Sequence, residues 1–400
     1  MKYGFCKIGE YVTVLSGYAF KSEDFQAVGV PVIKIGNIKL GHVSLDDGNT
    51  ECIPRAIADK LGRKFIVRKG DVLISLTGSH LTQPGSVVGR VGRYYYDSIS
   101  VLNQRAGKII VKDEEKSHLG FWFYLLSTKA VMTEIAMLAH GAANQANVSP
   151  KDIEKIWLPL PPLPIQKRIA AILSAYDELI ENNNRRIALL EKMAEEIYRE
   201  WFVRMRFPGH EKTKFHKGIP EGWEVKKLAE VVELCYGKAL KEEERSGSGF
   251  PVYGSSGIVG YHKIKLAEGP GIIVGRKGNV GSIFWSATDY YVIDTAYFVR
   301  AEISFRYLFF ALHSLNFVNN DSAVPGLNRS QAYSNFMLLP DANLLKRFDL
   351  EIGELLKVKE NLLQQNTLLK QTRDALLPRL MSGKLDVENL DIAFPPGMQN

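Results

Sequence analysis

The 400-residue chain is poor in cysteine and has no long apolar segment. Cys6, Cys52 and Cys235 form no Cys-x-x-Cys pair, so their spacing predicts neither a disulfide framework nor a zinc site. No run of about 18 apolar residues occurs, which argues against a membrane-spanning helix. The first residues lack the basic and then apolar order of a signal peptide. Together these absences predict a cytoplasmic protein.

The motifs of several enzyme classes are absent as well. Neither Pro161-Pro162 nor Pro395-Pro396 lies in the Asn/Asp-Pro-Pro-Tyr/Phe motif expected of a methyltransferase that acts on exocyclic amines. The segment Gly275–Ser282 lacks the Gly-Lys-Ser/Thr ending of a phosphate-binding loop. The eight histidines form no His-Glu-x-x-His pair, and no Gly-x-Ser-x-Gly elbow occurs. We therefore predict no catalytic residue, no metal site and no cofactor bound to this chain.

The composition is that of an ordinary soluble globular protein, with 46% hydrophobic and 24% charged residues. The length suits two or three domains better than one compact core. The net charge of +7, from 51 Lys and Arg against 44 Asp and Glu, permits a polyanionic partner without demanding one.

The chain contains an internal duplication. Gly17-Tyr-Ala-Phe-Lys21 precedes Pro31-Val32, and 220 residues later Gly237-Lys-Ala-Leu-Lys241 precedes Pro251-Val252. A second correspondence closes each copy, because Asn147-Val-Ser149 matches Asn328-Arg-Ser330 at a shift of 181. The motifs keep their order, and a long helical pattern follows each copy. Duplication therefore explains these short matches better than chance.

Each copy is rich in predicted strands. The segments 65–76 and 272–285 contain short β-branched runs with Gly-rich breaks, which predict strands and hairpins. Helical stretches are predicted late in each copy, at 120–138 and 305–318. Each domain is therefore expected to be a mixed α+β fold.

Two long helices are predicted, one after each copy. Apolar residues recur every three or four positions over 35–40 residues, which at 1.5 Å per residue makes a rod of roughly 50–60 Å. The predicted seam consists of Ile172, Tyr176, Leu179, Asn183, Leu190, Ile197, Ile352, Leu355, Leu362, Asn366, Leu369 and Leu376, with Ile169, Ile187 and Met193 in the same pattern. The second helix is expected to end at Pro378.

Two arrangements of these helices are open. Each helix could simply pack on its own domain, or the two could pair. The polar residues Asn183 and Asn366 favour pairing, because a seam Asn costs stability and fixes register, as in coiled coils. Two rods of equal length most simply pair antiparallel, which would relate the two domains by an approximate two-fold axis.

Six segments of the chain together carry a family resemblance: Leu158–Leu173, Trp201–His210, Gly218–Val225, Gly275–Gly281, Ile293–Tyr297 and Leu376–Leu385. In this order they resemble the specificity subunits of type I restriction-modification enzymes. The first three resemble the first conserved region of that family, the next two its second recognition domain, and the last its second conserved region. The match covers nearly the whole chain. The first domain departs from the recurrent motifs at Leu73–Ser79 and Asn103–Arg105, as expected if the two domains recognise dissimilar half-sites.

The resemblance implies a two-lobed DNA-binding protein. It implies target recognition domains at 1–160 and 204–342, conserved long helices at 161–203 and 343–384, and a tail at 385–400. It also implies that the chain binds double-stranded DNA together with two methyltransferase subunits and, for cleavage, two motor-nuclease subunits. S-adenosylmethionine, ATP and magnesium would then bind to those partners.

Sequence-specific reading of DNA needs hydrogen-bonding side chains on exposed loops and positive charge for the phosphates. Polar and basic residues in Gly-rich or amide-rich loops are the candidates. They are Thr77, Ser79, His80, Gln83, Asn103, Gln104, Arg105, Asn144, Gln145 and Asn147 in the first domain, and Ser255, Ser256, Arg276, Lys277, Asn279, Asn328 and Arg329 in the second.

Two rival functions stay open at this stage. A coiled-coil adaptor that does not read DNA would leave the duplicated domains and their loop amides unexplained. A divergent methyltransferase would bind S-adenosylmethionine as an isolated chain.

Overall fold

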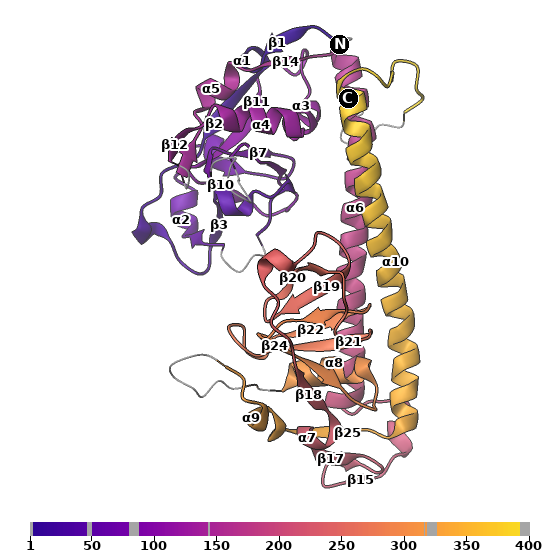
Figure 1. The fold of residues 1–400 in the computed structure, drawn as a ribbon. Coiled ribbons are helices and arrows are strands. Elements are labelled where there is room, and N and C mark those ends of the chain that lie inside the picture. Colours follow the sequence, from indigo (N-terminus) through magenta and orange to yellow (C-terminus); the bar gives the residue numbers. More distant parts are fainter. Residues whose placement is uncertain are drawn as a thin grey trace. The chain divides into compact units, whose positions relative to one another are not determined.

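The computed structural model describes residues 3–45, 50–79, 88–142, 145–315, 317 and 326–392. The chain forms two compact units, unit 1 from residues 1–182 and 365–400 and unit 2 from residues 183–364. Each unit holds one mixed α+β domain and a part of each long helix, α6 (Leu163–Tyr198) and α10 (Ala342–Met381) (Figure 1). The mixed α+β class is confirmed, whereas the predicted domain boundaries stay a prediction.

Unit 1 is built mainly from short strands. Its central five-stranded sheet has the order β2-β11-β7-β9-β4. A four-stranded sheet has the order β5-β3-β10-β6, and its strands are interleaved in the sequence with those of the central sheet. The strands are β1 (Phe5–Lys7), β2 (Val12–Ser16), β3 (Val30–Ile33), β4 (Gly41–His42), β5 (Cys52–Ile53), β6 (Ile66–Val67), β7 (Val72–Ser75), β8 (Thr77–Gly78), β9 (Val91–Arg93), β10 (Ser100–Leu102), β11 (Ala106–Val111), β12 (His140–Ala142), β13 (Gln145–Asn147) and β14 (Trp157–Pro159). The helices are α1 (Ile8–Tyr11), α2 (Arg55–Ala58), α3 (Leu119–Leu126), α4 (Lys129–Met137) and α5 (Pro150–Glu154).

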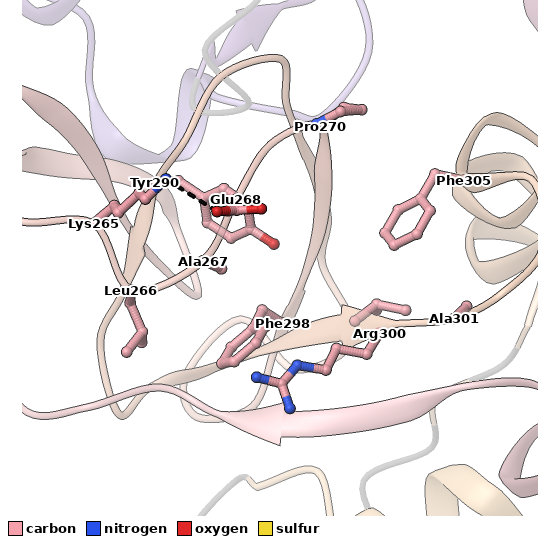
Figure 2. Close-up of a pocket in the computed structure, with 11 residues that line it drawn as sticks. Lys265, Leu266, Ala267, Glu268, Pro270, Tyr290, Phe298, Arg300, Ala301 and Phe305 are labelled. Carbon is pink, nitrogen blue, oxygen red and sulfur yellow. Dashed lines mark hydrogen bonds and ion pairs between the residues drawn. The ribbon is translucent and has the colours of Figure 1, made fainter.

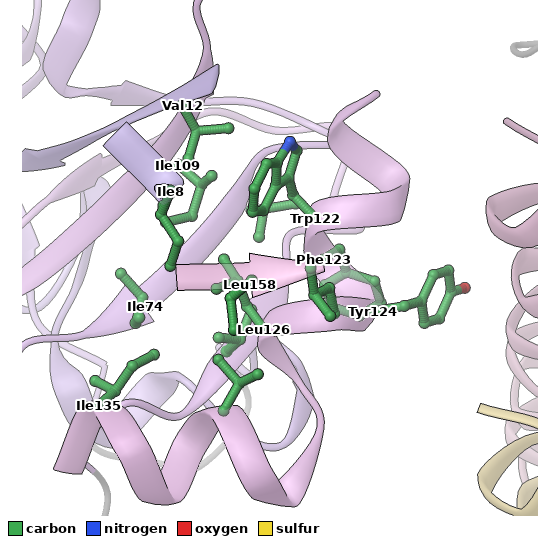
Figure 3. Packing of buried hydrophobic residues seen from close by; sticks show 14 of the residues in the cluster. Ile8, Val12, Ile74, Ile109, Trp122, Phe123, Tyr124, Leu126, Ile135 and Leu158 are labelled. Atoms are coloured by element: carbon green, nitrogen blue, oxygen red, sulfur yellow. The ribbon is translucent and has the colours of Figure 1, made fainter. Parts of the chain in front are cut away.

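The main core of unit 1 lies between the central sheet and α3 and α4. Trp122 and Leu126 on α3 are completely buried, and Ile109 on β11 and Leu158 on β14 belong to the same cluster (Figure 3). Residues from the beginning of α6 and the end of α10 complete this cluster. The two ends of the long helices are therefore part of the first domain's core.

Unit 2 repeats this plan with fewer strands. Its four-stranded sheet has the order β18-β24-β21-β22, which corresponds to β2-β11-β7-β9 of unit 1. The strands are β15 (Phe215–His216), β16 (Ile219–Pro220), β17 (Glu224–Lys227), β18 (Glu233–Tyr236), β19 (Phe250–Gly254), β20 (Gly257–His262), β21 (Gly271–Gly275), β22 (Ile283–Ser286), β23 (Tyr291–Val292), β24 (Ala296–Arg300) and β25 (Phe336–Leu339). The helices are α7 (Leu228–Val231), α8 (Phe305–Ser314) and α9 (Arg329–Tyr333).

The duplicated glycine motif has the same backbone geometry in both units. The Gly17 N–H donates to the Ala106 carbonyl at 3.0 Å, and the Gly237 N–H donates to the Ala296 carbonyl at 3.2 Å. A Cβ on Gly17 would lie 2.3 Å from the Asn103 carbonyl oxygen, and one on Gly237 would lie 2.1 Å from the equivalent oxygen of Ile293. Only glycine permits this close approach, so the duplication inferred from the sequence is confirmed at this motif. The second correspondence was wrong by two residues, because Val148 and Leu327, whose N–H groups donate to the Leu76 and Arg276 carbonyls, lie 179 and not 181 residues apart.

The long helices run antiparallel within each unit. In unit 1, Asp177 forms an ion pair with Arg373 at 2.5 Å, while the earlier Arg168 donates to the carbonyl of the later Val387. In unit 2, the aromatic rings of Phe202 and Phe348 lie 4.9 Å apart, near the end of one helix and the beginning of the other. Each domain core therefore contains residues of both long helices. The helices pack on the domains and also pair with each other, so the two arrangements occur together.

The predicted seam differs from the observed packing at a few positions. Leu179 is 53% exposed and Met193 is 50% exposed, while Ile180 and Ala194 beside them are buried. The remaining predicted seam residues are buried or half-buried, including Asn183 at 7% and Asn366 at 4% exposed. A one-residue error arises because spacings of three and four fit two adjacent faces of a helix nearly equally well.

Three local predictions were wrong in detail. The stretch predicted as one helix at 120–138 is two helices, because the Thr128 hydroxyl accepts from the Val131 N–H and begins α4 there. The runs around Lys69 do not form a hairpin, since β6 pairs with β10 while β7 pairs with β11 and β9. Helix α10 continues through Pro378 to Met381.

Candidate nucleic-acid interface

The polar residues predicted in the second domain gather where β21 ends. The N–H groups of Arg276 and Lys277 both donate to the Thr295 carbonyl, at 2.9 and 3.0 Å. The Arg276 guanidinium donates to the Asp294 carbonyl at 3.1 Å, and the Lys277 ammonium pairs with the Asp294 carboxylate at 3.1 Å. The backbone that carries both cationic side chains is therefore held by hydrogen bonds. Lys277 is exposed and Arg276 is half-buried.

A tyrosine that the sequence analysis missed organises the two arginines. The Tyr236 ring lies 5.0 Å from the Arg276 guanidinium and 5.2 Å from that of Arg329, and it is 50% exposed. Cation–π contacts of this kind hold a guanidinium in place while its outer N–H groups stay available. A signal existed in the sequence, because Tyr236 directly precedes Gly237 of the duplicated motif.

A second aromatic ring, that of Tyr297, packs against Tyr236. The rings of Tyr297 and Tyr236 are 5.0 Å apart, and the Tyr297 hydroxyl donates to the Leu327 carbonyl at 3.0 Å. Burial raises the pKa of Tyr297, with a smaller contribution from its hydrogen bond with Tyr236. The ring therefore stays neutral at physiological pH and does not cancel the charge of Arg276.

The remaining second-domain candidates line the same edge. The Asn279 amide donates to the Ser256 hydroxyl at 3.3 Å, and both side chains are exposed, whereas Ser255 is buried. The Leu327 N–H donates to the Arg276 carbonyl at 2.7 Å, which brings the beginning of α9 to this edge. There the Asn328 side chain accepts from the Ser330 N–H and caps the helix.

In the first domain, three candidate loops meet around Leu76. The Leu76 N–H donates to the Arg105 carbonyl at 3.0 Å, and the Leu76 carbonyl accepts from the Val148 N–H at 2.9 Å. The buried Thr77 hydroxyl donates to the Asn147 side chain at 2.7 Å. Thr77 therefore orients Asn147, which is itself exposed.

The other first-domain candidates divide between exposed and undescribed positions. Gln104 and Arg105 are exposed, and the half-buried Asn103 accepts from the Arg105 N–H at 3.4 Å. Ser79 is half-buried. His80, Gln83 and Asn144 lie outside the described residues, and of Gln145 only the backbone, in β13, is described.

The two clusters occupy equivalent places in the two domains. The backbone bonds of Leu76 to Arg105 and Val148 repeat as the bonds of Arg276 to Thr295 and Leu327. The equivalent side chains differ, however, because an apolar Leu76 stands where unit 2 has a cation. The same backbone frame thus presents different hydrogen-bonding and charged groups in each domain.

A pocket in unit 2 lies apart from this cluster. It has a volume of about 520 Å³ and is lined by Leu266, Ala267, Tyr290 and Phe298 among others (Figure 2). Its lysine, Lys265, is paired with Asp289 at 2.8 Å and Glu268 at 3.3 Å. No predicted DNA-contacting residue lines this pocket.

Two of the three cysteine thiols have raised pKa values. Burial raises the pKa of Cys6 to about 11 and also raises the pKa of Cys235, so neither thiol is a ready nucleophile. Among the residues that the structure describes, no three His, Cys, Asp or Glu side chains could hold a metal ion together. No helix in the same part of the chain is both long and apolar enough to span a bilayer.

Comparison with known proteins identifies the family. The family model described as "Type I restriction modification DNA specificity domain" matches residues 2–192 and 220–332. The chain is 27% identical over 320 residues to the type I restriction enzyme MjaIX specificity subunit of Methanocaldococcus jannaschii, covering 72% of this chain and 73% of that protein. It is 31% identical over 201 residues to the MjaVIII specificity subunit of the same organism, covering 49% of this chain and 44% of that protein.

A solved structure shows the same fold. The crystal structure of the type I restriction-modification system S subunit from M. genitalium superposes with a TM-score of 0.57 at 19% identity, covering 95% of this chain and 96% of that one. The repeated domain, the pair of long helices and the match of the family model to both domains agree with one another. The chain belongs to the family of type I restriction-modification DNA specificity subunits.

Proposed function

We propose that this chain binds one bipartite, asymmetric DNA target and directs methyltransferase and restriction subunits to it, without catalysing a reaction itself. The observation that carries the proposal is that the two domains repeat the same backbone hydrogen bonds around Leu76 and Arg276 but place unlike side chains there. Two equivalent domains can each read a short half-site, and unlike side chains at equivalent positions require unlike half-sites. The target is then asymmetric.

The residues of the second cluster have suitable chemistry for reading DNA. Arg276 and Arg329 can donate two parallel hydrogen bonds to a guanine edge, and Asn279 can do so to adenine. Lys277, on the same turn, suits a phosphate oxygen. In the first domain, Asn147, Gln104 and Arg105 supply comparable groups from β13 and from the turn between β10 and β11.

The long helices are proposed to set the gap between the half-sites. Helices of 36 and 40 residues are about 54 and 60 Å long at 1.5 Å per residue. DNA rises about 3.4 Å per base pair, so a rod of this length would separate the half-sites by several unread base pairs. Antiparallel helices would also present the two domains to DNA in opposite orientations.

The partners follow from family membership. Two methyltransferase subunits would modify one adenine in each half-site, and two motor-nuclease subunits would join them for cleavage. S-adenosylmethionine, ATP and magnesium would bind to those subunits.

Fluorescence anisotropy of the chain with its methyltransferase partner tests the proposal. Sequencing of modified adenines in the host genome supplies the target, and duplexes then carry both half-sites, either half-site alone, or both with the gap changed by one base pair. We expect tight binding only to the intact duplex. Equal binding of all duplexes at physiological salt would contradict sequence-specific reading.

A change in helix length tests the spacer separately. Deletion of one heptad from each long helix should shorten the unread gap while both half-sites stay the same. The modified-adenine pattern of cells that carry this variant reports the gap directly. An unchanged gap with intact half-sites would show that the helices do not set the distance.

A further inference from the structure

The two-stranded ribbon β1–β14 of unit 1 has one buried and one exposed face. Cys6 and Leu158, which are paired across the ribbon, point into the core. On the opposite face Phe5 is 51% exposed and Trp157 is 53% exposed. Lys7 pairs with Trp157 across the strands, and its ammonium lies 5.5 Å from the indole ring.

The ribbon β17–β25 of unit 2 repeats this arrangement. Val225 is 51% exposed and Phe336 is 60% exposed, while Met337 on the other face is buried. Lys227 pairs with Phe336 across the strands, and its ammonium lies 6.0 Å from that ring.

We call these two surfaces the ribbon faces, and they match position by position. The first consists of Phe5, Lys7, Trp157 and Pro159, and the second consists of Val225, Lys227, Phe336 and Leu338. Each therefore holds an apolar pair, a lysine and an exposed aromatic ring in the same register. Exposure of so much aromatic surface is unfavourable in water, and its repetition in both domains points to a common use.

The chemistry of the ribbon faces favours a protein over nucleic acid. Apart from one lysine each, their side chains have no hydrogen-bond donor suited to a base edge except the indole N–H. Exposed aromatic groups are typical of the anchor of a protein interface. Among the described residues, no carboxylate pairs with Lys7 or Lys227, so a partner can supply one to each.

The repetition identifies the kind of partner. Two equivalent faces on one chain require a partner that presents the same complementary surface twice, which means two copies of one subunit. Resting on the function proposed above, we propose that each ribbon face anchors one of the two methyltransferase subunits, through an apolar pocket for the ring and an acidic side chain for the lysine.

Native mass spectrometry of the full chain with the methyltransferase subunit of the same restriction-modification system tests this inference. The wild-type chain should bind two copies. Trp157→Ser or Phe336→Ser should each weaken one copy by about tenfold or more, leaving a one-to-one complex at limiting concentration, and the double variant should lose both. Met137→Ser and Ile258→Ser, at residues 71% and 53% exposed on other surfaces, are matched controls and should keep two copies.

Charge reversal gives a second route to the same answer. Lys7→Glu and Lys227→Glu keep the rings and should each weaken one copy, even if a serine variant failed to fold. Two copies bound by the ribbon variants as tightly as by wild type would overturn the inference. So would weaker duplex DNA binding with unchanged subunit binding, or dissociation of a dimer of the chain itself.

The failure of the proposed function has a different signature. A wild-type chain that binds no methyltransferase subunit would refute the function proposed above, and the inference with it. Full binding by the wild type and by every variant would refute the inference alone.

Discussion

The two domains of this chain share one backbone frame but not one surface chemistry. The two domains correspond at Gly17 and Gly237, in the strand order of their sheets and in the registers of their ribbons. These features are buried or tightly packed, and such groups tolerate little change. The edges of the two sheets differ, since in unit 2 Arg276 and Arg329 both contact the Tyr236 ring, whereas unit 1 has Leu76, Thr77 and Asn147 at its edge. The two domains thus share the buried backbone contacts that folding requires, and they differ in the side chains at the edge of the sheet.

The largest expected effect tests the shared frame. Gly17→Ala and Gly237→Ala should each lower the free energy of unfolding by more than about 3 kcal/mol, because the new methyl group meets a backbone oxygen at 2.3 or 2.1 Å. Gly62→Ala, whose nearest neighbour is a lysine side-chain atom at 3.9 Å, is the control. Denaturant unfolding measures all three, and a loss in only one domain would break the equivalence.

The next effect concerns how each unit holds its helices. Asp177 is 11% exposed, pairs with Arg373 and accepts from the Tyr124 hydroxyl at 2.6 Å. Burial of Tyr124 and the nearby Asp177 carboxylate raise the pKa of Tyr124, so the Tyr124 hydroxyl keeps its proton and donates it in this hydrogen bond. Asp177→Ala should cost about 2 kcal/mol, because it removes the buried acceptor of the Tyr124 hydroxyl and leaves the half-buried Arg373 guanidinium paired only with the exposed Asp374.

The counterpart in unit 2 should matter less. Glu191 pairs with Lys359 at 2.6 Å, but it is 52% exposed, so Glu191→Ala should cost about 1 kcal/mol or less. Thermal unfolding of both variants, each compared with wild type, measures the contrast. Equal losses would show that the two helix contacts are not as different as their burial suggests.

Arg276→Ala should change specificity at one half-site only. Loss of a two-pronged contact to a base should cost about 2 kcal/mol of discrimination at one position of the second half-site and none at the first. Anisotropy with duplexes altered at each position measures this. Arg300→Ala, an exposed cation elsewhere in unit 2, is the control, and equal binding of wild type and Arg276→Ala at all salt concentrations would remove Arg276 from the interface.

The smallest effect is expected at Lys277. As a phosphate contact, Lys277→Ala should weaken binding by less than about 1 kcal/mol for every sequence and lower the slope of affinity against salt by about one. A titration over several salt concentrations measures the slope. A change confined to one base position would instead make Lys277 a base-reading residue.

Much of the fold was predictable, because its signals are local or repeated. The Gly17 and Gly237 motifs, the strand-rich segments and the two helical repeats are visible in the sequence and agree with the structure. The break at Thr128 and the partners of β6 and β7 were not predictable. A capping hydroxyl competes with helix continuation, and strand pairing depends on segments far apart in the chain.

The candidate site was predictable only as a set of residue types. Arg276, Arg329 and Asn279 were predicted from their loops, but Tyr236 was missed, because its contact with two arginines exists only after β18, β21 and α9 come together. Thr77 was predicted as a contact residue, yet its buried hydroxyl is engaged by Asn147.

The amino-acid sequence by itself determined the repeated architecture, the long helices and the family, since each rests on periodicity or on motifs in order. Tertiary structure alone decided which side of each helix is buried, which side chains meet at the candidate interface, and that both domains leave an aromatic ring exposed beside a lysine. These depend on contacts between distant segments, and such contacts leave no pattern in the sequence of either segment taken alone.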